Sequence, residues 1–244
     1  MAGVANGTGA EEASLEPEIA GLASLGDPVR RRLYVYVSGR SGDVSRDEAA
    51  EATGISRTLA GFHLDRLVKE KLLEASFRRL SGRSGPGAGR PAKLYRRSAR
   101  QVEVSLPPRK YELAARILAT AVEASPGPRT RRALVRTARE VGEQIGAEAR
   151  ERVGPRAGRK RLVGGMVEAL AAQGYEPEKA GGEVRLRNCP FHALVGEHRD
   201  LVCGMNLALI EGVVDGLELP AAKPVLAPVP GRCCVCVRVG EAGT

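Results

Sequence analysis

The sequence predicts an α+β protein whose two folded regions are joined by a helical stretch. Three observations support this fold class. Positive charge is concentrated in residues 27–100, which hold 17 Lys and Arg against eight Asp and Glu. Helix caps and helical periodicity run through the first two thirds of the chain, whereas short alternating segments separated by glycine follow. All five cysteines lie in the last quarter.

Composition limits the class of protein. The 244 residues are 43% hydrophobic and 27% charged, which is typical of globular proteins with room for more than one core. Aromatic residues make up 3% and Trp is absent, which argues against a single-strand binder built on stacking platforms. No segment approaches twenty apolar residues, so we expect no membrane partner.

The N-terminus, residues 1–18, is acidic and rich in small residues. We expect a disordered tail there rather than a secretory signal, since a basic segment followed by an apolar run is missing. The expected localisation is cytoplasmic. In that compartment the cysteines are expected to be thiols or metal ligands rather than disulfides.

Three short helices are predicted after the tail. Asp27-Pro28 supplies an N-cap and a first-turn proline, and Gly39 ends the helix. Ser45-Arg-Asp-Glu48 is a capping box for a second helix, which stops at Gly54. Ser56 caps the third helix. Its face against the first two helices is predicted to include Leu59, Phe62, Leu64, Leu67 and Val68.

A basic hairpin is predicted after the third helix. Segments 72–80 and 92–97 have strand character and flank a glycine-rich turn at 81–90. Residues 81–100 carry six basic side chains and no acidic one. Capped helices followed by such a hairpin predict a winged helix-turn-helix domain over residues 19–104, with double-stranded DNA as its partner.

This geometry assigns candidate DNA contacts. The third helix is expected to lie in the major groove with its first turns at base edges, and the hairpin is expected to grip the phosphate backbone or minor groove. His63 also has an alternative role in helix packing or in phosphate contact. The candidates are Ser56, Arg57, Thr58, Gly61 and His63 on the helix, with Arg83, Arg90 and Lys93 on the hairpin.

Residues 105–174 are expected to form a helical linker and dimerisation segment, with helices at 111–123, 130–153 and 159–173. In the second of these, apolar residues recur with heptad-like spacing, which fits either a seam between two chains or packing on the helix's own domain. The helix at 111–123 is the other candidate interface. We expect a homodimer, because winged-helix repressors read two half-sites by two-fold symmetry. The heptad-like residues are Leu134, Ala138, Val141 and Ile145.

Residues 175–244 predict a small α+β sensor domain in the order ββαββ. The expected elements are strands at 175–179 and 183–187, a helix from about 200 to 214, and strands at 224–229 and 233–239. In an extended 233–239 segment Cys234 and Cys236 share one face. If Cys233 instead precedes the strand, it is free to point at a site.

The cysteine cluster favours a soft-metal or iron–sulfur site, since thiolates suit zinc, copper(I) and iron–sulfur clusters. Free cysteine is also a small apolar core residue, so each one alone has a structural interpretation. Two histidines lie nearby. The set is Cys189, Cys203, Cys233, Cys234 and Cys236, with His192 and His198.

Two resemblances sharpen this. The N-terminal region resembles ArsR-like winged-helix repressors at Leu25-Gly-Asp-Pro-Val-Arg-Arg-Arg-Leu33, Gly54-Ile-Ser-Arg57, Phe62-His-Leu-Asp-Arg-Leu67 and Gly89-Arg-Pro-Ala-Lys-Leu-Tyr95. Most of the chain resembles the SufR-type iron–sulfur repressors at Asn188-Cys-Pro-Phe-His192, Cys203 and Cys233-Cys234.

The second resemblance implies a DNA-binding transcriptional repressor that senses iron–sulfur or redox status. It also implies a [4Fe–4S] cluster held by Cys189, Cys203 and Cys233, with Cys234 the nearest substitute for the third ligand. The fourth ligand stays open among His192, Cys234 and Cys236.

Alternatives from other classes remain. One is a winged-helix regulator that responds to a small organic effector or to another thiolate-bound metal such as zinc, with the cysteines partly structural. Others are a thiol-redox enzyme with an accessory DNA-binding domain and a non-specific architectural DNA binder. We expect no enzyme, because the sequence offers no nucleophile–base pair, glycine-rich nucleotide loop or paired acid–base carboxylates.

Overall fold

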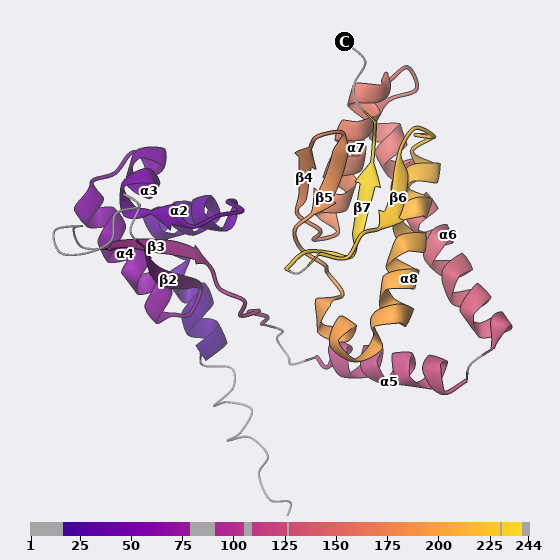
Figure 1. Cartoon of the computed structure of the whole chain (residues 1–244), viewed down its shortest axis with the longest axis horizontal. Helices are drawn as coiled ribbons and strands as arrows, with labels where there is room; N and C mark the ends of the chain where they lie inside the picture. Colours follow the sequence, from indigo (N-terminus) through magenta and orange to yellow (C-terminus); the bar gives the residue numbers. More distant parts are fainter. Residues whose placement is uncertain (1–16, 79–90, 105–108, 126, 230, 241–244) are drawn as a thin grey trace, which may run out of the picture. The chain divides into compact units, whose positions relative to one another are not determined.

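A computed structural model describes residues 17–78, 91–104, 109–125, 127–229 and 231–240. The chain divides into two compact units, which we call the N-terminal unit and the C-terminal unit (Figure 1). The first ends at Arg109 and the second begins at Lys110.

The N-terminal unit begins with helical residues 17–24, so part of the segment expected to be a disordered tail is helical. Three capped helices follow, as predicted. Asp27 accepts hydrogen bonds from two backbone amides, and Ser45 and Ser56 each accept one, so orphan N–H groups at each helix start are satisfied. The helices are α2 (Pro28–Ser38), α3 (Arg46–Thr53) and α4 (Arg57–Lys69).

A three-stranded antiparallel sheet completes this unit, in the order β1-β3-β2. Strands β2 (Leu73–Arg78) and β3 (Ala92–Arg97) form the predicted hairpin. The third strand, β1 (Val44–Ser45), was not predicted, since two residues are too few to show any periodicity. Leu33, Leu64 and Tyr95 are fully buried and join the helices to the sheet.

The predicted buried face of α4 is partly wrong. Leu64 and Leu67 are buried, but Leu59 is 40% exposed and Phe62 is 69% exposed. The buried stripe runs through Ala60, Leu64 and Leu67, at the spacing of four and three that one helix face requires. Leu59 and Phe62 lie outside that stripe.

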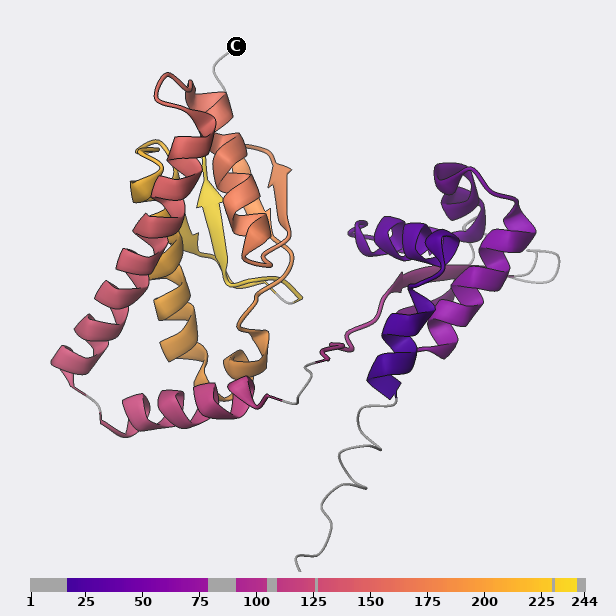
Figure 2. The ribbon, with the colours of Figure 1, turned by 180° about the vertical axis from the view of Figure 1, so that it is seen from behind.

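The described residues of the C-terminal unit form four helices and a four-stranded antiparallel sheet, in the order β4-β5-β7-β6. Helices α7 and α8 cover one face of the sheet (Figures 1 and 2). The predicted ββαββ order is present. The elements are α5 (Tyr111–Ala124), α6 (Pro128–Val153), α7 (Arg159–Ala172), β4 (Pro177–Ala180), β5 (Glu183–Leu186), α8 (His192–Gly216), β6 (Lys223–Leu226) and β7 (Val235–Arg238).

Helix α8 begins earlier than the predicted start near residue 200. Its first turns are separated from the rest by His198, whose φ of −127° and ψ of 41° are not helical. The His198 ring is buried and its Nδ1 lies 2.7 Å from Glu123 Oε2 on α5. This contact ties α5 to the break in α8.

Helices α6 and α8 pack backbone to backbone. A Cβ added to Gly142 or Gly146 of α6 would collide with the α8 backbone, and one added to Gly212 or Gly216 of α8 would collide with α6. Arg139 forms ion pairs across the same contact with Glu211 and Asp215. Close approach of this kind needs small residues four apart on both helices.

This packing bears on the heptad-like seam of α6. Ala138 is buried in the protein's own fold, whereas Val141 is 44% exposed, so the four apolar residues do not form one continuous surface. Helices α6 and α7 share a single core with the sheet. The segment expected to be a separate helical region is therefore part of the C-terminal unit.

No helix among the described residues has the length and apolar character needed to cross a lipid bilayer.

Candidate functional site

The outward side of α4 carries the first group of candidate residues. Arg57 and Thr58 are exposed. Arg57 Nε lies 2.8 Å from Asp47 Oδ1, but both side chains are mostly exposed, so this ion pair is weak and exchangeable. Ser56 accepts a hydrogen bond from the Leu59 amide at 3.3 Å, which gives its hydroxyl a structural role at the helix start.

Gly61 and His63 lie on the opposite, buried side of α4, which contradicts their predicted place at base edges. A Cβ on Gly61 would lie 2.8 Å from Arg46 Nε, so glycine allows α3 to approach α4. His63 is 8% exposed and packs edge-to-face on Phe62. The packing role considered for His63 is therefore the one that its position favours.

Lys93 connects the hairpin to α4. Asp65 accepts hydrogen bonds from Lys93 Nζ at 2.7 Å and from the Tyr95 hydroxyl at 2.8 Å. Burial alone would raise the pKa of Asp65, but these two bonds, together with the positive charges of Lys93 and Arg46, outweigh it and lower that pKa. Burial and the neighbouring carboxylate raise the pKa of Tyr95 to about 12. Arg83 and Arg90 lie outside the described residues.

The cysteines occupy three places around α8. Cys189 lies in the connection between β5 and α8, and Cys203 lies within α8. Strand β7 begins only at Val235, so Cys233 and Cys234 precede it. Alternation along the strand therefore does not govern these two side chains, and both are free to turn towards α8.

Four of the cysteines are in contact with one another. Cys189 hydrogen-bonds to Cys233, which in turn contacts Cys234. Cys234 also hydrogen-bonds to Cys203. Residues separated by up to 45 positions thus form one connected series, which we call the thiol chain: Cys189, Cys233, Cys234 and Cys203.

Two buried polar residues support the thiol chain. Asn206 donates from Nδ2 to Cys233 Sγ at 3.3 Å, and the Tyr175 hydroxyl donates to Asn206 Oδ1 at 2.6 Å. Asn206 is fully buried and Tyr175 nearly so. The tyrosine fixes the amide so that its N–H points at sulfur, which favours the charged thiolate.

The protonation pattern follows these contacts. The hydrogen bond from Cys189 lowers the pKa of Cys233 to about 6, assisted by the Val235 amide and Asn206. That same hydrogen bond, together with burial, raises the pKa of Cys189. Burial, and then the contact with Cys203, raises the pKa of Cys234. The thiol chain therefore holds a thiolate at Cys233 stabilised by neighbouring thiols.

The other candidate ligands lie elsewhere. Cys236 is on β7, where its electrostatic neighbours are Glu183, Arg185 and Arg238 and where burial raises its pKa. His192 is exposed, and His198 is paired with Glu123. Of the three residues left open as the fourth ligand, Cys234 is the one in contact with the other cysteines.

The thiol chain fits a thiolate-bound cofactor in chemistry, because its donors are soft and largely buried, and because Asn206 donates a hydrogen bond to one of them, Cys233. Its four cysteines interact in pairs, and they do not surround a common point at which a metal or cluster could sit. Within the part of the chain that the structure describes, no three His, Cys, Asp or Glu side chains form a preformed metal site. Binding such a group requires these side chains to turn towards a common centre.

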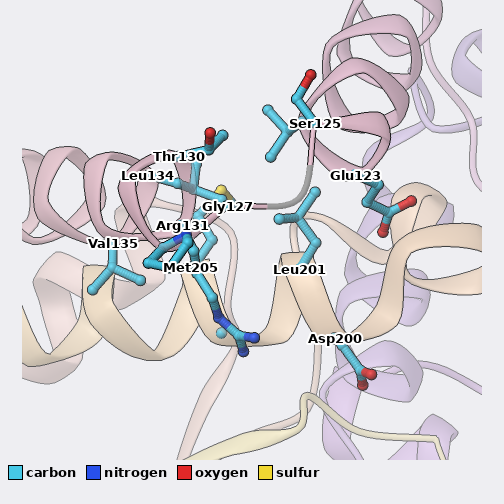
Figure 3. A pocket seen from close by; sticks show the side chains of 13 residues that line it. Glu123, Ser125, Gly127, Thr130, Arg131, Leu134, Val135, Asp200, Leu201 and Met205 are labelled. Carbon is cyan, nitrogen blue, oxygen red and sulfur yellow. The ribbon is translucent and has the colours of Figure 1, made fainter.

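A separate pocket of about 620 Å³ lies where the end of α5, the start of α6 and α8 meet. Leu134, Leu201 and Met205 supply apolar wall (Figure 3). The charged ends of Arg131 and Asp200 point to the same side of it. A volume of this size with mostly apolar walls suits a small organic molecule.

Sequence reasoning missed Asn206, Tyr175 and Asp65. Asn206 had a signal, since it is a lone amide within the apolar run from Val202 to Ile210, three residues after Cys203. Tyr175 and Asp65 had none, because their partners lie about thirty residues away. No family model, curated protein or solved structure matches the chain.

Proposed function

We propose that this protein is a DNA-binding transcriptional regulator, acting as a repressor, whose C-terminal unit senses iron–sulfur or redox status through its cysteines. The observation that carries the proposal is the thiol chain, which gathers four distant cysteines in one unit. The other unit contains residues 27–100, which hold 17 Lys and Arg against eight Asp and Glu.

The N-terminal unit is assigned as a winged helix. Its three capped helices and three-stranded antiparallel sheet support that assignment, as does the exposed start of α4. In this proposal α4 enters the major groove with Arg57 and Thr58 at base edges, and Arg83 and Arg90 contact the backbone. Lys93 holds α4 against the hairpin through Asp65.

The cofactor is a [4Fe–4S] cluster held by Cys189, Cys203 and Cys233, with Cys234 as the fourth ligand. When bound, it supplies a group that is gained, lost or oxidised with the iron and redox state of the cell. The chain contributes the Asn206 hydrogen bond to Cys233 and a largely buried setting, both of which tune such a group.

The active form is a homodimer joined through α5. None of its described residues is buried in the fold of this chain. Four large apolar side chains on α5 are more than half exposed, which is unusual for one helix of fourteen residues. The second copy supplies the matching surface, as operator half-sites related by a two-fold axis require. These residues are Tyr111, Leu113, Ile117 and Leu118.

DNA binding is tested by selecting duplexes from a random library with the full chain at fixed salt, then measuring affinity as salt is raised. A repressor enriches a sequence with two related half-sites, and its affinity falls steeply with salt because counterions are released. Equal affinity for selected and random duplexes indicates an architectural binder and contradicts the proposal.

The sensor is tested on protein purified without oxygen, by visible absorption together with iron and acid-labile sulfide assays. Wild type should carry matching iron and sulfide. Cys189→Ser and Cys203→Ser should lose both while the N-terminal unit stays folded. Cys236→Ser is the control and should keep the cofactor, since Cys236 lies apart from the thiol chain. Unchanged iron and absorbance in the first two variants contradict the assignment.

A second candidate function is regulation by a small organic effector, and the pocket between α5, α6 and α8 favours it. In that case the cysteines serve as core residues. A colourless protein that resists reconstitution and holds no zinc or copper supports this candidate, provided that Met205→Trp, which fills the pocket, abolishes the response to effector.

A further inference from the structure

Phe62 is at the centre of the outward face of α4. It follows Thr58 by four residues and precedes Arg66 by four, so the three side chains share that face. Its ring is 69% exposed. The adjacent Leu59 is 40% exposed, so the centre of the helix surface is apolar. An apolar centre on a surface proposed to enter the major groove needs an apolar group opposite it.

The Phe62 ring is supported from within the unit. His63 is buried, and its ring meets that of Phe62 edge-to-face at 75° with centroids 5.3 Å apart. Such a contact restricts the ring, which therefore loses less conformational entropy when a partner binds.

Charge around Phe62 identifies the class of partner. Arg57 lies five residues before Phe62 on α4, and Arg66 and Lys69 follow it on the same helix. All three basic side chains are exposed. The segment that contains α4 holds 17 Lys and Arg against eight Asp and Glu. An exposed apolar ring on a basic helix surface matches a polyanion that also presents apolar groups.

In double-stranded DNA the apolar group of the major groove is the thymine C5-methyl; the other base edges there present hydrogen-bond donors and acceptors. We propose that Phe62 contacts a thymine C5-methyl and specifies thymine at one position of each half-site. This inference rests on the proposed DNA binding. In this inference the centre of α4 recognises DNA through an apolar contact made by Phe62. The sequence had instead predicted DNA contacts for Gly61 and His63.

The test uses the full chain and the duplex selected above. Each thymine is replaced in turn by deoxyuridine, which removes only the methyl group and keeps base pairing. Wild type should lose affinity about fourfold at one thymine of each half-site, the amount expected for uncovering one buried carbon. Replacement at the other thymines should have little effect.

Phe62→Ala should bind the unmodified duplex more weakly than wild type. It should also become insensitive to deoxyuridine at that thymine. Phe77→Ala is the matched control, because Phe77 is 66% exposed in the same unit but lies on β2. That variant should keep the wild-type sensitivity. Equal thermal stability of the variants rules out an effect through folding.

Two results overturn the inference and leave DNA binding standing: no thymine whose methyl matters to wild type, or a deoxyuridine penalty that persists in Phe62→Ala. Failure to enrich any duplex overturns the inference together with the proposed function. Coupling between Phe62 and one methyl group supports both.

Discussion

The two units hold their polar chemistry in opposite places. In the N-terminal unit the candidate residues Arg57 and Thr58 are exposed, and Arg57 pairs with Asp47 across an exposed contact. In the C-terminal unit the candidate site is internal, since Cys203, Cys233 and Asn206 are all buried. The first unit is therefore suited to meet a large charged partner, and the second to hold a small group away from water.

Sensitivity to mutation should follow this contrast. Exposed groups can be replaced at little cost in stability, and their loss shows in binding. Buried groups that touch backbone or other polar atoms cannot be replaced without disturbing the fold. The four predictions below test this contrast.

Gly212→Ala should have the largest effect, because the added Cβ collides with the Arg139 carbonyl and Glu143 amide of α6. We expect a loss of about 3 kcal/mol in the stability of the C-terminal unit, measured by chemical denaturation. Gly204→Ala is the control on the same helix. Its Cβ meets nothing within 4 Å, so it should stabilise the helix by about 0.5–1 kcal/mol. Equal effects would mean that the helices are not in close contact.

Ile117→Glu should break the proposed dimer, since it places a charge on the exposed apolar face of α5. We expect the dissociation constant to rise about 100-fold, measured by sedimentation equilibrium. Val35→Glu provides the comparison, because Val35 is 63% exposed and Ile117 is 61% exposed. Dissociation by Val35→Glu alone would move the interface to the N-terminal unit.

Cys189→Ala should raise the pKa of Cys233 in the reduced, cofactor-free protein, because it removes the main hydrogen bond that holds that pKa at about 6. Ultraviolet absorbance of the thiolate reports the titration, and Cys236→Ala should leave it unchanged. The folded pKa lies below the ordinary value of 9.0, so this thiolate stabilises the fold above about pH 9. That stability declines as pH falls towards about 6 and is absent in Cys233→Ser.

Ser56→Ala should have the smallest effect on stability, about 1 kcal/mol, because it removes one cap from α4 in the N-terminal unit. Thermal unfolding measures it, and Ser56→Asp should restore the value because aspartate caps equally well. An unchanged midpoint in Ser56→Ala would indicate that water replaces the hydroxyl fully.

Local rules predicted the helices well and their faces less well. The caps at Asp27, Ser45 and Ser56 have short-range chemical causes, and all three are present. Which face of α4 is buried depends on neighbours far along the chain, and apolar character alone placed Leu59 and Phe62 wrongly.

The same distinction applies to the cysteines. Their number and clustering were visible in the sequence, but their mutual contacts depend on where β7 begins. The glycines joining α6 to α8 recur at intervals of four in both helices, a pattern that can be recognised in the sequence itself. The role of Asn206 could be recognised only from the fold, because the packed sheet brings Cys233 within hydrogen-bond distance of it.

The start of α8 has a consequence for how the protein responds to salt. An ion pair between Glu197 and Arg116 and a hydrogen bond between His198 and Glu123 join it to α5. Cys189 lies three residues before α8, so in the proposed sensor these contacts connect the thiol chain to α5. The Arg116 pair is exposed and therefore screened by salt. If the protein is the proposed regulator, ionic strength should act on it in two ways, by weakening its contacts with DNA phosphate and by weakening the ion pair between α5 and α8.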